Sequence, residues 1–382
     1  MVLTNSSWKG TWPMISRRFG AAPIAVVLLL ALILLAAGCG SSTTSTTGGA
    51  TTTAATTAST TASTTAATTT TTTVGAKLAK LVLVAPPGPM AIPMAYLVAN
   101  NKLASIADKT ELVIWENPDQ LKAIVAGNQG DFVTMPSNNA AIFYNKGLPV
   151  KLLDVSVWNI TYLISSDKNA KTLADLKGQS VVVSFKGSVP DLMFQYLAKK
   201  QGLDVEKDLK VTYAADPTQA AQLLLAGQAQ NAVLSEPLST SVLLQTKDGP
   251  KTYYRTLNFA TEWEKSAGAG ELTAIAGTVA TASVMDKPAV IAEYLKQYKA
   301  AVEWMVANPD AAGTLIETQL PQLGFKAAPM AASLKSITWK FTPAGEARTD
   351  LEKFLTVLSE LSPDVIGGKL PDDGFYFQGA DK

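Results

Sequence analysis

The polar residues that follow predicted strands are the groups of this sequence best suited to bind a small molecule. Lys186-Gly187-Ser188 comes directly after an apolar run at 181–185 and before a predicted helix. Free backbone N–H groups at a helix start can bind an anion or a carbonyl oxygen, and Gly187 would let a ligand approach closely. A capped helix start without any ligand predicts the same residues, with Ser188 as the N-cap. The sequence leaves both interpretations open.

Other positions offer further groups for a ligand. Ser137-Asn138-Asn139 follows another predicted strand and supplies hydrogen-bond donors and acceptors, although an N-cap explains Ser137 equally well. Glu236 could pair with a cationic ligand or favour a helix N-terminus. Trp158 could stack on a flat ligand or pack in the core. The candidate ligand-binding residues are Pro87, Met90, Ser137, Asn138, Asn139, Trp158, Phe185, Lys186, Gly187, Ser188, Ser235 and Glu236.

The residue types on which most catalytic and metal sites rely are missing. The chain has no histidine, and its single cysteine is Cys39. This composition removes the commonest general base, thiol nucleophiles, Cys/His zinc sites and structural disulfides. No G-x-S-x-G or P-loop pattern occurs. We therefore expect no catalytic residue, no cofactor and no metal site.

The charge of the chain also limits its partners. The formal net charge is +1 and the sequence has no basic stripe, so nucleic acid is not an expected partner. Arg255 and Arg348 are the only arginines after position 18. A bidentate clamp on a carboxylate or phosphate would have to use one of these two side chains. The composition thus argues mildly against a heavily anionic ligand.

The N-terminal segment has the pattern of an export signal. Residues 1–20 carry positive charge without acid, residues 21–38 are apolar, and Cys39 follows Gly38. This stretch resembles a bacterial lipoprotein signal, which implies a lipidated Cys39 and a location on the outer face of the cell membrane. An uncleaved anchor is the alternative, since about 18 apolar residues can span a bilayer. The Ser/Thr-rich residues 41–73 predict a disordered linker.

An internal repeat predicts the elements that position the candidate residues. Strand-like runs at 81–84 and 132–135 recur, about 100 residues later, at 181–185 and 232–234. Each copy predicts strands that alternate with helices, which indicates parallel sheets covered by helices. In such sheets, ligands bind beyond the carboxyl ends of the strands. Later helices are predicted at about 287–307, 327–337 and 343–360.

The order of several motifs resembles a known family. Thr172-Leu173-Ala174-Asp175-Leu176-Lys177-Gly178-Gln179 precedes a valine-rich strand, and Ala-Gly pairs stand at 126–127 and 226–227. This pattern resembles the solute-binding proteins of ABC importers in the nitrate/sulfonate/taurine and thiamine-precursor group, over about residues 78–310. The resemblance implies an α/β, type II periplasmic-binding-protein fold. Its two lobes would each have a mixed, mostly parallel sheet flanked by helices and would be joined by two crossing segments.

The resemblance also implies how the chain divides. Residues 1–38 would be the signal peptide and 39–76 the lipidated cysteine with its linker. Residues 77–166 plus 269–382 would form lobe one, and 167–268 would form lobe two. The crossing segments are expected at 160–165 and 271–279.

The same resemblance implies a function. A small solute, such as a sulfonate, a nitrate-like anion or a thiamine- or flavin-type heterocycle, would bind between the lobes of a monomer. The closed form would deliver it to an ABC permease and its ATPase. One alternative is a sensory or surface protein without a transporter. Another is the related eukaryotic enzyme of pyrimidine synthesis, which is disfavoured because that resemblance implies a histidine and a cysteine-rich iron site.

Overall fold

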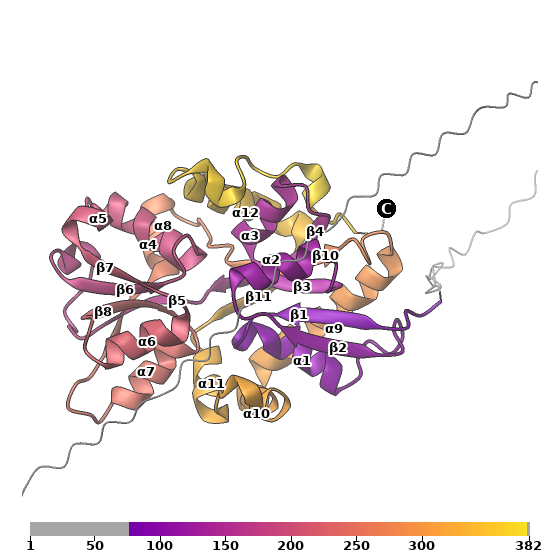
Figure 1. Ribbon diagram of the computed structural model, residues 1–382, viewed down its shortest axis with the longest axis horizontal. Coiled ribbons are helices and arrows are strands. Elements are labelled where there is room, and N and C mark those ends of the chain that lie inside the picture. Colours follow the sequence, from indigo (N-terminus) through magenta and orange to yellow (C-terminus); the bar gives the residue numbers. More distant parts are fainter. Residues whose placement is uncertain (1–75, 380–382) are drawn as a thin grey trace, which may run out of the picture. The chain divides into compact units, whose positions relative to one another are not determined.

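The computed structural model describes residues 76–379. The expected signal peptide, Cys39 and nearly all of the expected linker lie outside these residues. Two separate sheets, each with helices on both faces, make up the described part (Figure 1). No helix within 76–379 is long and apolar enough to cross a membrane.

The first sheet has six strands in the order β11-β4-β10-β3-β1-β2. The first three strands of the chain run parallel, whereas β10 is antiparallel to both of its neighbours and β11 is antiparallel to β4. The strands are β1 (Leu81–Ala85), β2 (Thr110–Ile114), β3 (Phe132–Pro136), β4 (Val150–Asn159), β10 (Ala276–Thr281) and β11 (Thr338–Pro343).

The second sheet has five strands in the order β7-β6-β8-β5-β9. Here β6 is parallel to β7 and β8, and β5 is antiparallel to β8 and β9. The strands are β5 (Thr161–Ser165), β6 (Ser180–Ser184), β7 (Lys210–Ala214), β8 (Asn231–Ser235) and β9 (Tyr254–Asn258). The two sheets confirm the predicted α/β fold with two mixed sheets flanked by helices, although antiparallel strand pairs slightly outnumber parallel ones.

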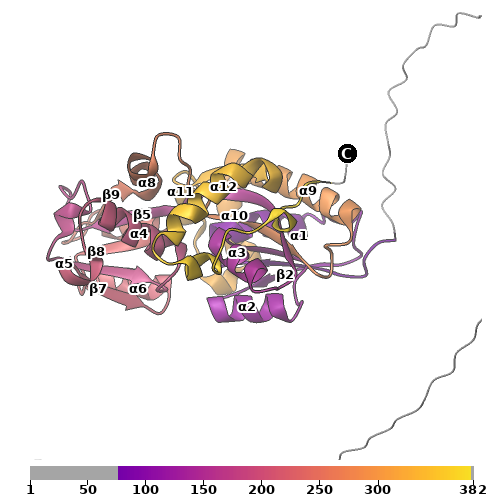
Figure 2. The same ribbon diagram turned by 90° about the horizontal axis from the view of Figure 1, so that it is seen from above.

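Helices connect the strands and cover both sheets. They are α1 (Ile92–Ala99), α2 (Pro118–Ala126), α3 (Ser137–Asn145), α4 (Val189–Lys200), α5 (Val205–Asp208), α6 (Pro217–Leu225), α7 (Leu238–Thr246), α8 (Phe259–Ala267), α9 (Pro288–Ala307), α10 (Pro309–Gln319), α11 (Ala327–Leu334) and α12 (Ala344–Ser359). Short 3₁₀ turns are η1 (Pro89–Ala91), η2 (Ala174–Leu176), η3 (Pro321–Leu323), η4 (Pro363–Ile366) and η5 (Asp373–Phe375). Helix α12, drawn in yellow in Figure 2, packs against strand β4 and helix α4.

The two sheets repeat one another, as the sequence predicted. The order β10-β3-β1-β2 corresponds to β5-β8-β6-β7, and the first strand of each series is antiparallel to the second. Local signals repeat as well. Asn117 and Asp216 each accept a hydrogen bond from the backbone N–H three residues later, at 2.9 and 2.8 Å. Pro118 and Pro217 follow at the first helical position, where the missing N–H costs no hydrogen bond.

The chain crosses between the sheets earlier than expected. Strand β4 ends at Asn159 in the first sheet and β5 begins at Thr161 in the second, so that Ile160 alone makes the crossing. The expected division placed residues 161–166 in lobe one, whereas β5 is hydrogen-bonded within the second sheet. The chain returns between α8 and β10. From here on, lobe two denotes residues 161–267 and lobe one the rest of 76–379.

Candidate functional site

The loops that follow the strands of the two lobes come into contact. Gly88, in the loop between β1 and η1, has a φ of +107°, and a Cβ on it would lie 3.5 Å from Pro237 Cδ. Pro237 belongs to lobe two and lies between β8 and α7. The loop after β1 of lobe one therefore faces the loop after β8 of lobe two. In this arrangement, a solute bound between the two lobes would be in reach of loops from both of them.

A group of polar side chains, here named the polar junction, ties lobe two to lobe one. Its centre is Arg255 on β9, whose Nη1 donates to Ser336 Oγ of lobe one at 2.7 Å. Arg255 Nη2 donates to Glu236 Oε1 and, at 2.9 Å, to Thr240 Oγ1. The guanidinium lies 4.2 Å from the centre of the Tyr162 ring, and the Tyr162 hydroxyl donates to the Ser336 carbonyl oxygen.

Burial governs the electrostatics of the polar junction. The Glu236 side chain is fully buried, whereas the Arg255 side chain is 25% exposed. Burial raises the pKa of the Glu236 carboxyl, and the Arg255 guanidinium and the Thr240 amide offset part of that rise. The positive charge of Arg255 is thus already balanced within the protein. The Nε–H of Arg255, in contrast, is buried without a partner and can still donate one hydrogen bond.

The helix start predicted to hold an anion is occupied by the protein itself. The Gly187 N–H donates to Asp191 Oδ2 at 2.7 Å, and the Ser188 N–H donates to the Phe185 carbonyl at 2.9 Å. Ser188 lies at the N-cap of α4, but its hydroxyl donates to the Ser184 carbonyl instead of capping the helix. An anion at this helix start would have to compete with the Asp191 carboxylate.

The candidate residues of lobe one are engaged in internal contacts. Ser137 is the first residue of α3, and its hydroxyl donates to the Ala274 carbonyl at 2.5 Å. Asn138 is buried, and its amide donates to the Val365 carbonyl at 3.3 Å while Oδ1 has no partner. Trp158 is 4% exposed, and its indole N–H donates to the Lys340 carbonyl at 2.8 Å. The structure places Trp158 in the core, which is the second of the two interpretations given for it above.

The remaining candidates differ in their surroundings. Pro87 is exposed, and Met90 is half-buried against the core of lobe one. Asn139 is half-buried in the first turn of α3. Lys186 is exposed, with Nζ 5.2 Å from the centre of the Tyr213 ring. Ser235 Oγ lies 3.2 Å from Thr161 Oγ1. The structure therefore brings Glu236 to the polar junction and Ser235 to Thr161, but leaves the asparagines and Trp158 in lobe one.

The sequence reasoning did not nominate Tyr162, Arg255 or Ser336 as site residues. Arg255 did carry a signal, because it is one of two arginines after position 18. Ser336 and Tyr162 carried none, since a serine after a helix and a tyrosine in a strand are common everywhere. Their roles depend on a pairing between lobes that lie far apart in the sequence.

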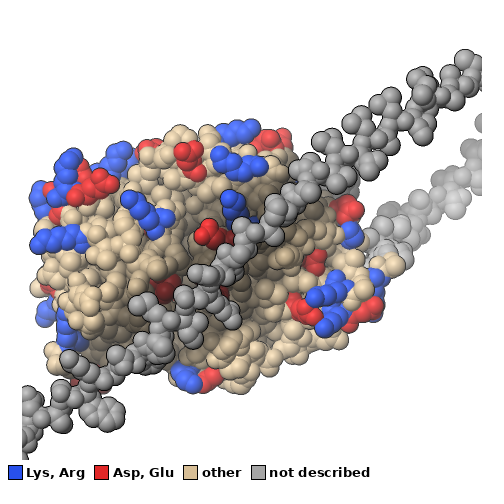
Figure 3. Space-filling view, viewed as in Figure 1, with Lys and Arg blue, Asp and Glu red and all other residues tan. Residues whose placement is uncertain are grey.

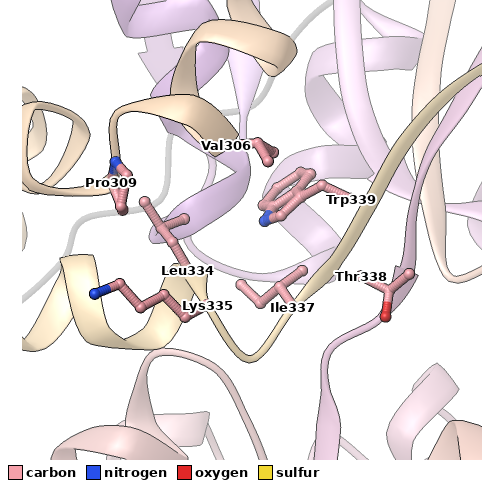
Figure 4. A pocket seen from close by; sticks show the side chains of 7 residues that line it. All are labelled: Val306, Pro309, Leu334, Lys335, Ile337, Thr338 and Trp339. Atoms are coloured by element: carbon pink, nitrogen blue, oxygen red, sulfur yellow. The ribbon is translucent and has the colours of Figure 1, made fainter.

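A cavity lies beside Ser336, on the lobe-one side of the polar junction. It measures about 350 Å³ and is lined by Val306, Pro309, Leu334, Lys335, Ile337, Thr338 and Trp339 (Figure 4). All of these side chains belong to lobe one, from the end of α9, the start of α10, the end of α11 with the connection that follows it, and β11. Among residues 76–379, no group of three or more histidine, cysteine or acidic side chains could hold a metal ion.

Solved structures with a similar fold extend over most of the chain. An ABC transporter from Parabacteroides distasonis is 23% identical with a TM-score of 0.63, over 78% of this chain and 99% of that one. The periplasmic aliphatic sulphonate binding protein SsuA from Escherichia coli is 18% identical with a TM-score of 0.62, over 80% and 94%. The periplasmic nitrate-binding protein NrtA from Synechocystis PCC 6803 is 14% identical with a TM-score of 0.57, over 76% and 84%.

These likenesses establish the fold, a two-lobe architecture found in periplasmic binding proteins. No curated protein matches the chain. A family model described as NMT1/THI5 like matches residues 109–312, which is more than half of the 382 residues. The matched part runs from β2 through the crossing at Ile160 and all of lobe two to α10. The chain belongs to the NMT1/THI5-like family.

Proposed function

We propose that this protein is an extracytoplasmic solute-binding lipoprotein that captures a small molecule between its lobes and delivers it to an ABC import permease. The observation that carries the proposal is the close approach of the two lobes at Gly88 and Pro237, in loops that follow strand ends, next to the polar junction. A solute that contacts both lobes favours the closed state through those contacts. The permease, its ATPase and the lipid on Cys39 belong to the proposal, as does the monomeric state.

The charges of the site suggest which solutes suit it. The Arg255 charge is balanced by Glu236, and Asp191 occupies the N-terminus of α4. A strongly anionic solute would meet no unpaired cation at either place. A planar, weakly charged heterocycle of the thiamine or flavin type suits this arrangement better than a sulfonate or a nitrate-like anion. Basic and acidic side chains are interspersed on the face shown in Figure 3, which does not favour nucleic acid.

Catalysis is not part of the proposal. The chain has no histidine, and Cys39 is its only cysteine. The buried polar groups of the polar junction are hydrogen-bonded to one another, which suits recognition of a solute better than proton transfer. A surface protein that binds the same solute without a transporter is the second candidate.

A binding screen on the full-length chain in detergent tests the proposal. Thiamine and flavin precursors, alkanesulfonates and nitrate are added one at a time, and the melting temperature is measured. A bound solute raises the melting temperature because it stabilises the folded state by mass action. The gain in the free energy of unfolding is about 2.7 kcal/mol when the solute concentration is a hundred times the dissociation constant. Calorimetry with Arg255→Met then tests the site, because this variant removes the free Nε–H. Binding that Arg255→Met leaves unchanged, or turnover of any compound, would contradict the proposal.

A further inference from the structure

Asp154 is a fully buried acid in the middle of β4 that the proposed function does not use. Neither oxygen of its carboxyl group has a partner within normal hydrogen-bond geometry, although the Ser156 and Thr278 hydroxyls lie close to it. Within residues 76–379, no lysine or arginine acts on it. Buried charges in proteins are normally paired or bound to metal ions, and an exception requires an explanation.

Hydroxyl groups from β4 itself, β10, β3 and α9 form a cluster with Asp154. They belong to Ser156 on β4, Thr278 on β10, Thr134 on β3, and Tyr294 and Tyr298 on α9. Thr134 Oγ1 and Thr278 Oγ1 lie 3.4 Å apart, and Ser156 Oγ lies 3.5 Å from the Tyr298 hydroxyl. The Tyr294 hydroxyl is buried and also lacks a partner. The cluster is therefore rich in oxygen atoms and contains no positive charge.

The titratable neighbours of Asp154 remain neutral. Burial, together with the nearby carboxyl, raises the pKa of Tyr298 to about 12 and that of Tyr294 well above its ordinary value. Burial also raises the pKa of Asp154 to about 7, although the Ser156 and Thr278 hydroxyls partly stabilise the carboxylate. A protonated Asp154 carries no charge and can donate a hydrogen bond to one of these hydroxyls.

We propose that Asp154 is a buried proton-binding site and that lobe one folds around the neutral carboxylic acid. Loss of the proton to solvent leaves an unpaired charge between β4 and β10. The chain leaves lobe one at the end of β4 and re-enters it at the start of β10. Ionisation of Asp154 therefore weakens the strand pair that joins lobe one to both crossings.

The sign of the pH dependence follows from the raised pKa. In the unfolded chain, Asp154 has an ordinary pKa of 3.8 and loses its proton above that pH, whereas the folded chain keeps it up to about pH 7. The extra stability that protonated Asp154 gives the folded chain at low pH is therefore lost progressively as the pH rises from 3.8 to about 7. The folding equilibrium constant falls by about tenfold per pH unit in that window and becomes constant above it.

The test compares Asp154→Asn with the wild type, both full length and in the same detergent. Urea unfolding is measured between about pH 5 and about pH 8, and the wild type should lose stability more steeply, by about tenfold per pH unit up to pH 7. Asp119→Asn, an exposed acid on α2, serves as the control and should follow the wild type. Parallel pH profiles for Asp154→Asn and the wild type would overturn the proposal. The proposal would also be overturned if replacing choline by sodium in the buffer stabilised the wild type but not Asp154→Asn, because this result would indicate a bound cation.

Infrared spectroscopy provides a second test in case Asp154→Asn does not fold. The probe is the carbonyl stretch of a buried, protonated carboxyl group. It is recorded in Glu236→Gln, because Glu236 is another buried carboxyl with a raised pKa. The band should be present at about pH 5 and disappear towards about pH 8. Its absence at the lower pH would contradict the proposal.

Discussion

Two of the groups through which the lobes contact each other have opposite character. The polar junction consists of the Arg255, Glu236, Tyr162 and Ser336 contacts described above. The second group, here named the aromatic junction, places Trp263 of α8 against Phe354 of α12, with ring centres 4.9 Å apart. Tyr196 of α4 also packs against Trp263, with ring centres 4.9 Å apart. One apolar core cluster therefore runs from lobe one into lobe two, while a second is confined to lobe two.

The difference indicates which contact yields first when the lobes separate. Apolar packing has no preferred direction and tolerates small rotations, but it loses energy when water enters. Hydrogen bonds require alignment, and water replaces them at a low net cost of about 0.5–1.5 kcal/mol each. We infer that the aromatic junction is the pivot and that the polar junction opens.

The largest expected effect comes from removing the centre of the aromatic junction. Trp263 is 1% exposed, and Trp263→Ala should lower the free energy of unfolding by about 3–5 kcal/mol. Urea unfolding measures the loss, and Trp263→Phe should retain most of the stability. If the aromatic junction is the pivot, Phe354→Ala combined with Trp263→Ala should cost less than the sum of the two changes. Strict additivity would show that the rings do not act together.

The next effect concerns the charge pair of the polar junction. Arg255→Met leaves the buried Glu236 carboxylate without its counter-charge and should cost about 2 kcal/mol, less than the 3–5 of a fully buried pair because Arg255 is 25% exposed. The loss should shrink as the pH falls, because a protonated Glu236 needs no partner. Arg255→Met combined with Glu236→Gln should recover part of the stability. A loss that does not change with pH would indicate that packing, not charge, is responsible.

A smaller effect is expected from the lobe-one side of the polar junction. Ser336→Ala removes the hydrogen bond from Arg255 Nη1 but keeps the backbone carbonyl that accepts from Tyr162. It should lower the free energy of unfolding by only about 1 kcal/mol. Small-angle scattering should nevertheless show a more open average structure. A Ser336→Ala protein as compact as the wild type would weaken the assignment of this junction as the opening side.

The smallest effect is expected at an ion pair between α4 and lobe one. Lys200 Nζ lies 3.7 Å from Glu360 Oε2, and the two side chains are 42% and 50% exposed. Lys200→Gln should change stability by about 0–0.5 kcal/mol, and the change should vanish at high salt. A loss above 1 kcal/mol would mean that this contact contributes to the pivot.

Much of the repeated α/β pattern could be predicted, whereas the boundaries of the lobes could not. Caps such as Asn117 and Asp216 lie within three residues of the groups they satisfy, so they were visible as local signals. Strands β4 and β5 are separated by Ile160 alone, in a stretch that is buried throughout. Without a turn residue there, the sequence did not mark where one sheet ends and the other begins. Helix α10 and strand β11 were not predicted at all.

The site was predicted less well than the fold. Ser235 and Glu236 were nominated. Glu236 lies at the polar junction and Ser235 contacts Thr161, and their role in binding a solute stays a prediction. Ser188 was expected to cap α4, yet Asp191 turns back to Gly187 and occupies that helix start. This outcome depends on Tyr213 of the neighbouring strand, which donates to the same carboxyl at 3.2 Å.

The sequence by itself determined the alternation of strands and helices, the helix caps and the absence of histidine, because each of these depends on residue types or on neighbours a few positions away. Only the tertiary structure decided that Arg255 meets Ser336, 81 positions further along the chain, and that Trp263 meets Phe354. It also decided that Asp154 is enclosed by hydroxyls from three strands and a helix. Such pairings follow from the order of strands in a sheet and from the packing of helices on it, which no local pattern encodes.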